Sequence, residues 1–249
     1  MLTFFRRIRK GLISQSKLSR YLIYAIGEIV LVVIGILIAL QINNWNERAK
    51  IRETEKDILY NLRAELMSNQ DRLKASIDIH KSEYENGLIL LSLFNTDISH
   101  LPEPKLDSLV GNIEGGHTFE ANQGYIKSLI ASNKIDYIQN EDLKSYISSF
   151  ESMVIDATQE VDDVKRLLNE RLWPAIDGKL SGLNRLRTFP GFQEFPRGTY
   201  KSDYDWFLGN REMEDLVSNI ISWKVETIKD EEILSEAIED MVSIIDSEL

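Results

Sequence analysis

The first pattern along the chain is a continuous apolar run near the N-terminus. Between Leu22 and Leu40 only Tyr24 and Glu28 carry polar side-chain groups. At a helical rise of about 1.5 Å per residue, the run covers roughly 28 Å, close to the hydrocarbon thickness of a bilayer. A buried helix of a soluble core is the alternative, but such a helix rarely stays apolar on every side for this length. The pattern therefore predicts a transmembrane helix over residues 21–42.

A cleaved signal peptide is a second interpretation of the same run. Signal peptides have an apolar region of up to about 15 residues that ends at a small-residue cleavage site. The run is longer than that, and its exit, Ala39-Leu-Gln-Ile-Asn, lacks an A-x-A pattern. We therefore expect a retained signal-anchor and a single-pass protein.

Beyond the span, apolar residues recur every four or seven positions, which indicates amphipathic helices. The first stripe runs from Ile51 to Leu91 without a proline, so one helix is predicted from about residue 21 to 94, with Gly87 as its only weak point. A second stripe follows the N-cap residue Asn140 as far as Pro174, and a third follows Asn210 to the C-terminus.

Shorter elements lie between these stripes. Short helices are expected at 106–113 and 121–132, and an ordered but irregular, aromatic-rich excursion at 176–209. No strand-like alternation is long enough to suggest a sheet. The predicted fold is all-α, with one N-terminal transmembrane helix that continues into a long helical stalk, and an antiparallel helical bundle with short extra helices. If the stalk needs a second chain to bury its stripe, it would instead form an intermolecular coiled coil.

The sign of the charge also changes at the end of the apolar run, at about residue 42. Residues 1–42 contain six basic residues and Glu28 alone, whereas the remaining residues carry a net charge of −16. Such an acidic domain is repelled by nucleic acid, which we exclude as a partner. Four basic residues follow the span, diluted by acids, so the positive-inside bias predicts a cytoplasmic N-terminus and a periplasmic domain over residues 43–249.

The ends of the span carry residues suited to a membrane interface. Residues 1–20 place apolar side chains at helical spacing among basic ones, which predicts a basic amphipathic segment on the cytoplasmic leaflet. A positive flank that only sets topology is the alternative. The predicted interface residues are Arg6, Arg7, Arg9, Lys10, Tyr21, Tyr24 and Trp45.

Glu28 lies inside the apolar run, where an ionised carboxylate is costly. On a helical wheel Glu28, Val32, Gly35 and Ala39 form one narrow stripe. Small residues four apart let a second helix approach closely, and the stripe would turn Glu28 toward that partner. This stripe is the predicted transmembrane association face. The alternative is a lone helix whose Glu28 is protonated and reaches toward the interface.

Candidate chemistry is sparse. Cysteine is absent, and His80, His100 and His117 have no metal-ligand spacing, so structural or solvent-exposed roles are expected for them. The serine in Gly178–Gly182 is at the wrong offset for a nucleophile elbow. The segment Asp203–Glu214 is not a calcium-binding loop, because Leu208 occupies the sixth position, where such a loop requires glycine. We therefore predict no cofactor, no metal and no enzymatic activity.

The stretch Tyr24–Glu47, which includes the exit Gln41-Ile-Asn-Asn-Trp45, resembles the signature of a family of uncharacterised single-pass membrane proteins of Gram-negative bacteria. The likeness extends more loosely to 124–136 and 140–143. The resemblance implies an envelope protein with a helical outer domain and implies no activity. It also implies that Glu28 belongs to a defined motif.

These observations predict a protein of the bacterial inner membrane with a helical domain in the periplasm. It would act as a scaffold, sensor or adaptor, in contact with the lipid bilayer, through self-association or docking on another membrane protein. A small homo-oligomeric channel with Glu28 and Gln41 facing the pore is the alternative. A third hypothesis is an envelope enzyme with its site in the aromatic segment 189–206.

Overall fold

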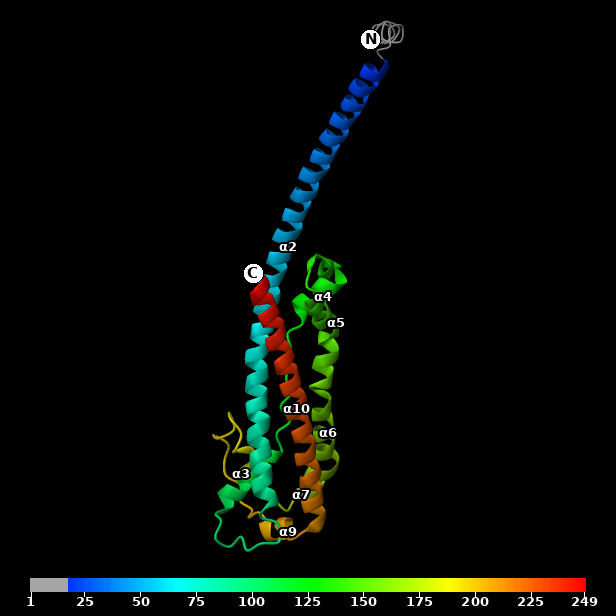
Figure 1. Ribbon diagram of the computed structural model, residues 1–249. Helices are drawn as coiled ribbons and strands as arrows, with labels where there is room; N and C mark the ends of the chain where they lie inside the picture. The colour runs from blue at the N-terminus through cyan, green and yellow to red at the C-terminus, as the bar shows by residue number, and fades with distance from the viewer. Residues whose placement is uncertain (1–17) are drawn as a thin grey trace. The chain divides into compact units, whose positions relative to one another are not determined.

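A computed structural model describes residues 18–249, whose elements are all helical (Figure 1). The chain divides into two compact units, Met1–Lys56 and Asp57–Leu249. One helix, α2 (Leu18–Leu91), begins in the first unit and ends in the second, as the apolar pattern predicted. No strand occurs within 18–249, so the predicted all-α class is confirmed.

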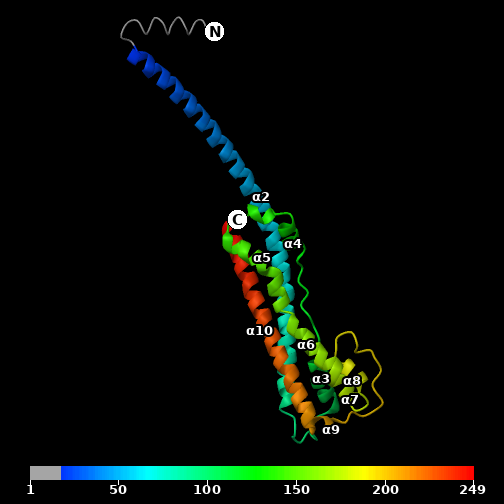
Figure 2. The same cartoon turned by 90° about the vertical axis from the view of Figure 1, so that its right-hand side faces the viewer.

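The second unit is a bundle built on three helical segments. These are α2 from residue 57 onward, the segment that starts with α5 (Glu141–Asp156) and α6 (Gln159–Leu167), and α10 (Arg211–Glu248). Figures 1 and 2 both show α10 beside α2 and beside α5 and α6. Arg63 pairs with Asp246 and Gln70 donates to Ser235, so α2 and α10 are antiparallel.

The helix predicted between Asn140 and Pro174 is interrupted, so that prediction of one continuous element was wrong. α5 ends at Asp156, and Ala157 and Thr158 separate it from α6. The Thr158 hydroxyl donates to the Val154 carbonyl at 2.9 Å, a local bond that competes with the helical pattern. A π-helical turn, η2 (Leu168–Leu172), then leads into α7 (Trp173–Ile176), which carries the helix past Pro174.

The chain returns from the end of α2 to the start of α5 through short elements. α3 (Glu103–Ile113) begins earlier than predicted, because a proline in the first helical turn needs no N–H partner. An extended segment then leads to α4 (Gly124–Ala131) and to the 3-10 turn η1 (Lys134–Tyr137). Asn140 caps α5 by accepting from the Leu143 N–H, as the sequence predicted.

The excursion at 176–209 contains two five-residue helices, α8 (Gly182–Leu186) and α9 (Tyr204–Leu208). Ser181 and Asp203 cap them by accepting from backbone N–H groups. Tyr204, Phe207 and Leu208 are buried, which ties the end of the excursion to the bundle. The rest of the segment between and around these two helices is irregular.

The bundle has two separate hydrophobic cores along its length. The first core packs α2 residues from Ile58 to Ile77 against α4, α5 and the C-terminal half of α10. The second packs Leu90 and Phe94 against α3, the α6–α7 segment, α9 and the N-terminal part of α10. Both cores lie entirely within residues 57–249.

Candidate functional site

The predicted association face lies on the exposed surface of α2. The side chains of Glu28, Val32 and Ala39 are exposed, and a Cβ added to Gly35 would meet no atom within 4 Å. Tyr24 and Trp45 are also exposed, and Tyr21 is half-buried. Arg6, Arg7, Arg9 and Lys10, with most of the predicted basic segment, lie outside the described residues.

α2 is long and apolar enough to cross a membrane, and none of the residues in its apolar window is buried. If α2 were the core helix of a soluble protein, other parts of the chain would cover this apolar surface. In residues 18–56 the stripe of Glu28, Val32, Gly35 and Ala39 therefore remains open for a partner or lipid.

A layer of buried charge separates the two hydrophobic cores of the second unit. On α2 it falls after Ile77, the last α2 residue of the first core, and before Leu90, the first of the second core. Its charged side chains are His80 and Glu83 of α2, and Lys224 and Glu231 of α10, each less than a tenth exposed. Charges at this depth are tolerated only when each one has a partner.

His80 stands between two acceptors. Its Nδ1 lies 2.8 Å from a Glu231 carboxylate oxygen and its Nε2 lies 3.1 Å from the His117 carbonyl oxygen. The other Glu231 oxygen accepts from the Ser76 hydroxyl at 2.7 Å. Because a carbonyl and an ionised carboxylate can only accept, these two contacts fit the doubly protonated, positively charged imidazole.

The pKa of His80 agrees with this assignment. Burial by itself would lower that pKa, but the hydrogen bond and charge of Glu231, the charge of Glu83 and the His117 carbonyl together raise it above the usual value. The His117 ring also faces His80, with the ring centroids 5.8 Å apart. His80 thus has a structural role, as predicted, in a buried ion pair.

Lys224 forms the second ion pair of the layer. Its ammonium donates to a Glu83 oxygen at 2.5 Å and to the Gly115 carbonyl at 2.9 Å. Burial lowers the pKa of Lys224, while the charge of Glu83 opposes that shift. A Cβ at Gly115 would overlap the Glu83 carboxylate, so only glycine lets the backbone approach this pair.

The extended segment after α3 supplies the Gly115 and His117 carbonyls that accept from the charge layer, and it then continues along α2. Asn69 and Asn122 exchange two hydrogen bonds of 2.7 and 2.8 Å. The buried carboxylate of Glu65 accepts from the N–H groups of Tyr125 and Ile126 in the first turn of α4. A carboxylate at a helix N-terminus is stabilised by unpaired N–H groups and by the helix dipole.

The sequence interpretation missed this layer. Within the segment Glu114–His117, the carbonyls of Gly115 and His117 accept from Lys224 and His80, a role that no motif in the segment signals. Periodicity carries a partial signal, because His80, Glu83, Lys224 and Glu231 occupy buried positions within otherwise apolar stripes. In residues 18–249 we find no group of His, Cys, Asp or Glu that could hold a metal ion.

A pH-dependent contribution to stability is expected from His80. A raised folded-state pKa means that the contribution is complete below about pH 6.5, the unfolded value, and is lost as pH rises through the folded value. The stability difference between wild type and His80→Gln should therefore shrink with rising pH, by at most about 1.4 kcal/mol per pH unit. Urea unfolding followed by circular dichroism at a series of pH values measures it.

His100→Gln is the matched control for the His80 prediction, because His100 is exposed and lies in the loop after α2. Its unfolding profile should run parallel to that of wild type. Parallel profiles for wild type and His80→Gln would show that the buried imidazole does not titrate with folding.

The fold defines the class of protein: a helical bundle whose first helix carries an exposed apolar segment long enough to span a membrane. A family model described as "Family of unknown function (DUF6090)" matches residues 28–156, just over half of the chain. The chain therefore belongs to this family of unknown function. The match begins at Glu28 and ends with the last residue of α5. Comparisons with curated proteins and with solved structures return no match.

Proposed function

We propose that this protein is a non-catalytic scaffold, sensor or adaptor anchored in the bacterial inner membrane. Its N-terminus lies in the cytoplasm, α2 crosses the bilayer once, and residues 43–249 lie in the periplasm. It acts through self-association or by docking on another membrane protein. The observation that carries the proposal is the apolar segment of α2, which has no buried residue in its apolar window and whose stripe of Glu28, Val32, Gly35 and Ala39 is exposed.

Three physical arguments support this proposal. An apolar helix with no buried residue in its apolar window is stable in a bilayer and unfavourable in water. The basic residues ahead of the span favour a cytoplasmic N-terminus. The small residues Gly35 and Ala39 allow close helix packing, and Glu28 could then hydrogen-bond within an interface that excludes lipid.

A homo-oligomeric channel is the second candidate function, and the position of Glu28 is the observation that favours it. A ring of acidic side chains around a common axis attracts cations. The channel requires several copies with Glu28 turned inward, whereas a packing face requires only two helices. The number of copies and the conductance therefore distinguish the two functions.

Substitutions in the span test the proposal. Gly35→Ile should reduce cross-linked oligomer severalfold, because a branched side chain separates the helix backbones. Gly27→Ile is the matched control, since Gly27 is also exposed with no atom within 4 Å of an added Cβ and lies off the stripe. Glu28→Gln should change association little, since an amide still hydrogen-bonds across the interface and contributes about 1 kcal/mol.

Planar-bilayer recording of the wild type completes the test. If Glu28 lines a pore, Glu28→Gln should leave the oligomer intact and change cation conductance. A monomer that is insensitive to Gly35→Ile and shows no conductance would overturn both candidate functions.

A further inference from the structure

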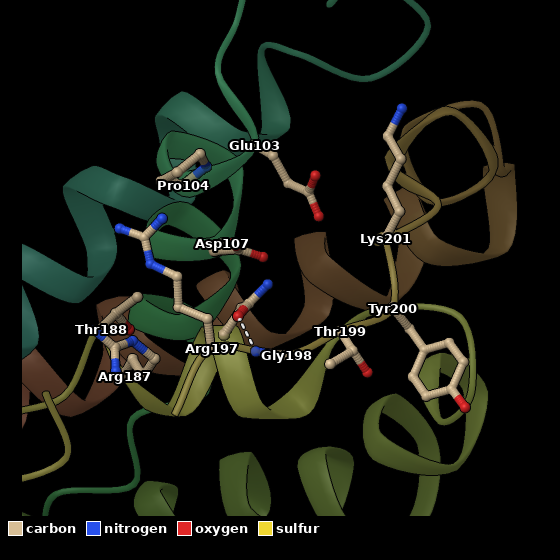
Figure 3. A pocket seen from close by; sticks show the side chains of 11 residues that line it. Glu103, Pro104, Asp107, Arg187, Thr188, Arg197, Gly198, Thr199, Tyr200 and Lys201 are labelled. Carbon is tan, nitrogen blue, oxygen red and sulfur yellow. Dashed lines mark hydrogen bonds between the residues drawn. The ribbon is translucent and has the colours of Figure 1, made fainter. Parts of the chain in front are cut away.

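A hollow of about 490 Å³ lies on the second unit, between α3, α8 and the loop that precedes α9. Figure 3 shows the side chains that line it. Sites for small molecules commonly have volumes of about 300–1,000 Å³. Three cations contribute to the lining, Arg187 directly after α8 and Arg197 and Lys201 on the loop, and we call this site the basic hollow.

The charge of the basic hollow contrasts with its surroundings. Residues 43–249 carry a net charge of −16, yet residues 178–201 contain five basic residues and one acidic residue. Such a concentration of one sign in a concave site raises the local concentration of ions of the opposite sign. Acidic solutes would therefore be attracted here although the domain as a whole repels them.

The cations of the basic hollow have no partner in the part of the chain that the structure describes. No side-chain hydrogen bond or ion pair joins Arg187, Arg197 or Lys201 to residues 18–249. The neighbouring Arg185 shows the contrast, because it is buried and its Nε contacts both Glu114 carboxylate oxygens at 3.1 Å. The structure thus uses Arg185 for the fold and leaves the other three cations available.

Two acids also line the hollow, but internal donors already occupy them. A Glu103 oxygen accepts from the Ser202 N–H at 3.0 Å, and an oxygen of the buried Asp107 accepts from the Tyr204 hydroxyl at 2.6 Å. Burial raises the pKa of Asp107.

Neutral donors complete the lining. The Asn184 carbonyl oxygen accepts from the Gly198 N–H at 2.8 Å, the bond drawn in Figure 3, which leaves the Asn184 amide N–H groups to donate elsewhere. Thr199 adds a hydroxyl, and the aromatic ring of Tyr200, 87% exposed, lies next to it. Planar guanidinium groups with nearby amide and hydroxyl donors match the oxygens of carboxylates and phosphates.

We propose that the basic hollow binds a small oxyanion ligand, a solute that carries carboxylate or phosphate groups, through Arg187, Arg197 and Lys201. Asn184 and Thr199 supply further hydrogen bonds, and Tyr200 covers a non-ionic part of the ligand. The site goes beyond the scaffold function and is independent of the span, because every lining residue lies within Asp57–Leu249. If the protein is a sensor, this ligand is a candidate signal.

The test is calorimetric titration of the full-length protein in detergent with inorganic phosphate and, separately, with citrate. Binding of at least one probe is expected, and the tighter one identifies the ligand as a phosphate or a carboxylate. Arg187→Gln and Arg197→Gln should each weaken that binding about tenfold, as expected for the loss of a charge-assisted hydrogen bond.

Lys134→Gln is the matched control, because Lys134 is exposed, makes no side-chain bond within residues 18–249 and does not line the hollow. It removes the same charge and should leave the affinity unchanged. Arg197 lies on an exposed loop, so its replacement leaves the cores intact. Absence of binding to both probes, or equal weakening by Arg197→Gln and Lys134→Gln, would overturn the proposal.

Discussion

Lys224→Met should lower the free energy of unfolding by about 3–5 kcal/mol, since it breaks a buried ion pair by removing one partner. The variant leaves the Glu83 carboxylate buried without its counter-charge and removes the donor to the Gly115 carbonyl. Methionine matches the length of the lysine stem, so the loss of packing is small. Urea unfolding followed by circular dichroism measures the change.

Lys229→Met on the same helix is the matched control. Lys229 pairs with Glu226 at 2.7 Å, but both side chains are about half exposed, and an exposed pair of this kind contributes about 0.3–0.5 kcal/mol. The control should therefore change stability by less than about 0.5 kcal/mol. Equal effects of the two variants would show that the charge layer is hydrated and does not need its counter-charge.

Replacing both partners of the buried ion pair shows how much of the lost stability comes from the unpaired charge and how much from packing. In Lys224→Met with Glu83→Leu no charge is left unpaired, so most of the loss should be recovered. Recovery should be incomplete, because the buried Gly115 carbonyl still lacks a donor, which costs about 1–3 kcal/mol.

The helices that could be predicted from the sequence are those whose apolar stripe remains in phase. α2 and α10 have such stripes: α10 begins after the predicted cap Asn210, and α2 ends at Leu91, close to the predicted end at about residue 94. The break between α5 and α6 could not be predicted in this way, because no glycine or proline marks Ala157 or Thr158. Apolar residues keep their phase across it, and Ala157 and Val161 are both buried.

The stripe on α2, the charge layer and the basic hollow differ in how much of their geometry follows from local sequence. The stripe of Glu28, Val32, Gly35 and Ala39 lies within one helix, so its geometry follows from spacing alone, while its role in association remains a prediction. The charge layer joins His80 to Glu231, 151 residues away, so the partners are known only once α2 and α10 are placed side by side. The basic hollow likewise combines Asp107 with Arg197 through tertiary contacts, which no local pattern encodes.

Gly87, the weak point of the first helical stripe, allows α10 to pack closely on α2. A Cβ at this position would overlap the terminal carbon of Ile221 and lie 2.7 Å from its Cγ1, within contact distance of Ile113. Gly87→Val should therefore lower the free energy of unfolding by about 1–3 kcal/mol or more, because overpacking outweighs a gain in helix propensity of a few tenths.

A second variant tests whether Ile221 is the reason for that loss. Ile221→Ala alone should cost about 2–5 kcal/mol, because it leaves a cavity in the second core. Valine adds three carbon atoms at Gly87 and alanine removes three at Ile221, so the double variant conserves volume across the contact. It should be more stable than the sum of the two losses predicts, by about 1–3 kcal/mol. Exact additivity in urea unfolding would mean that the two residues do not share space, and that the close approach of α2 and α10 at Gly87 does not occur in solution.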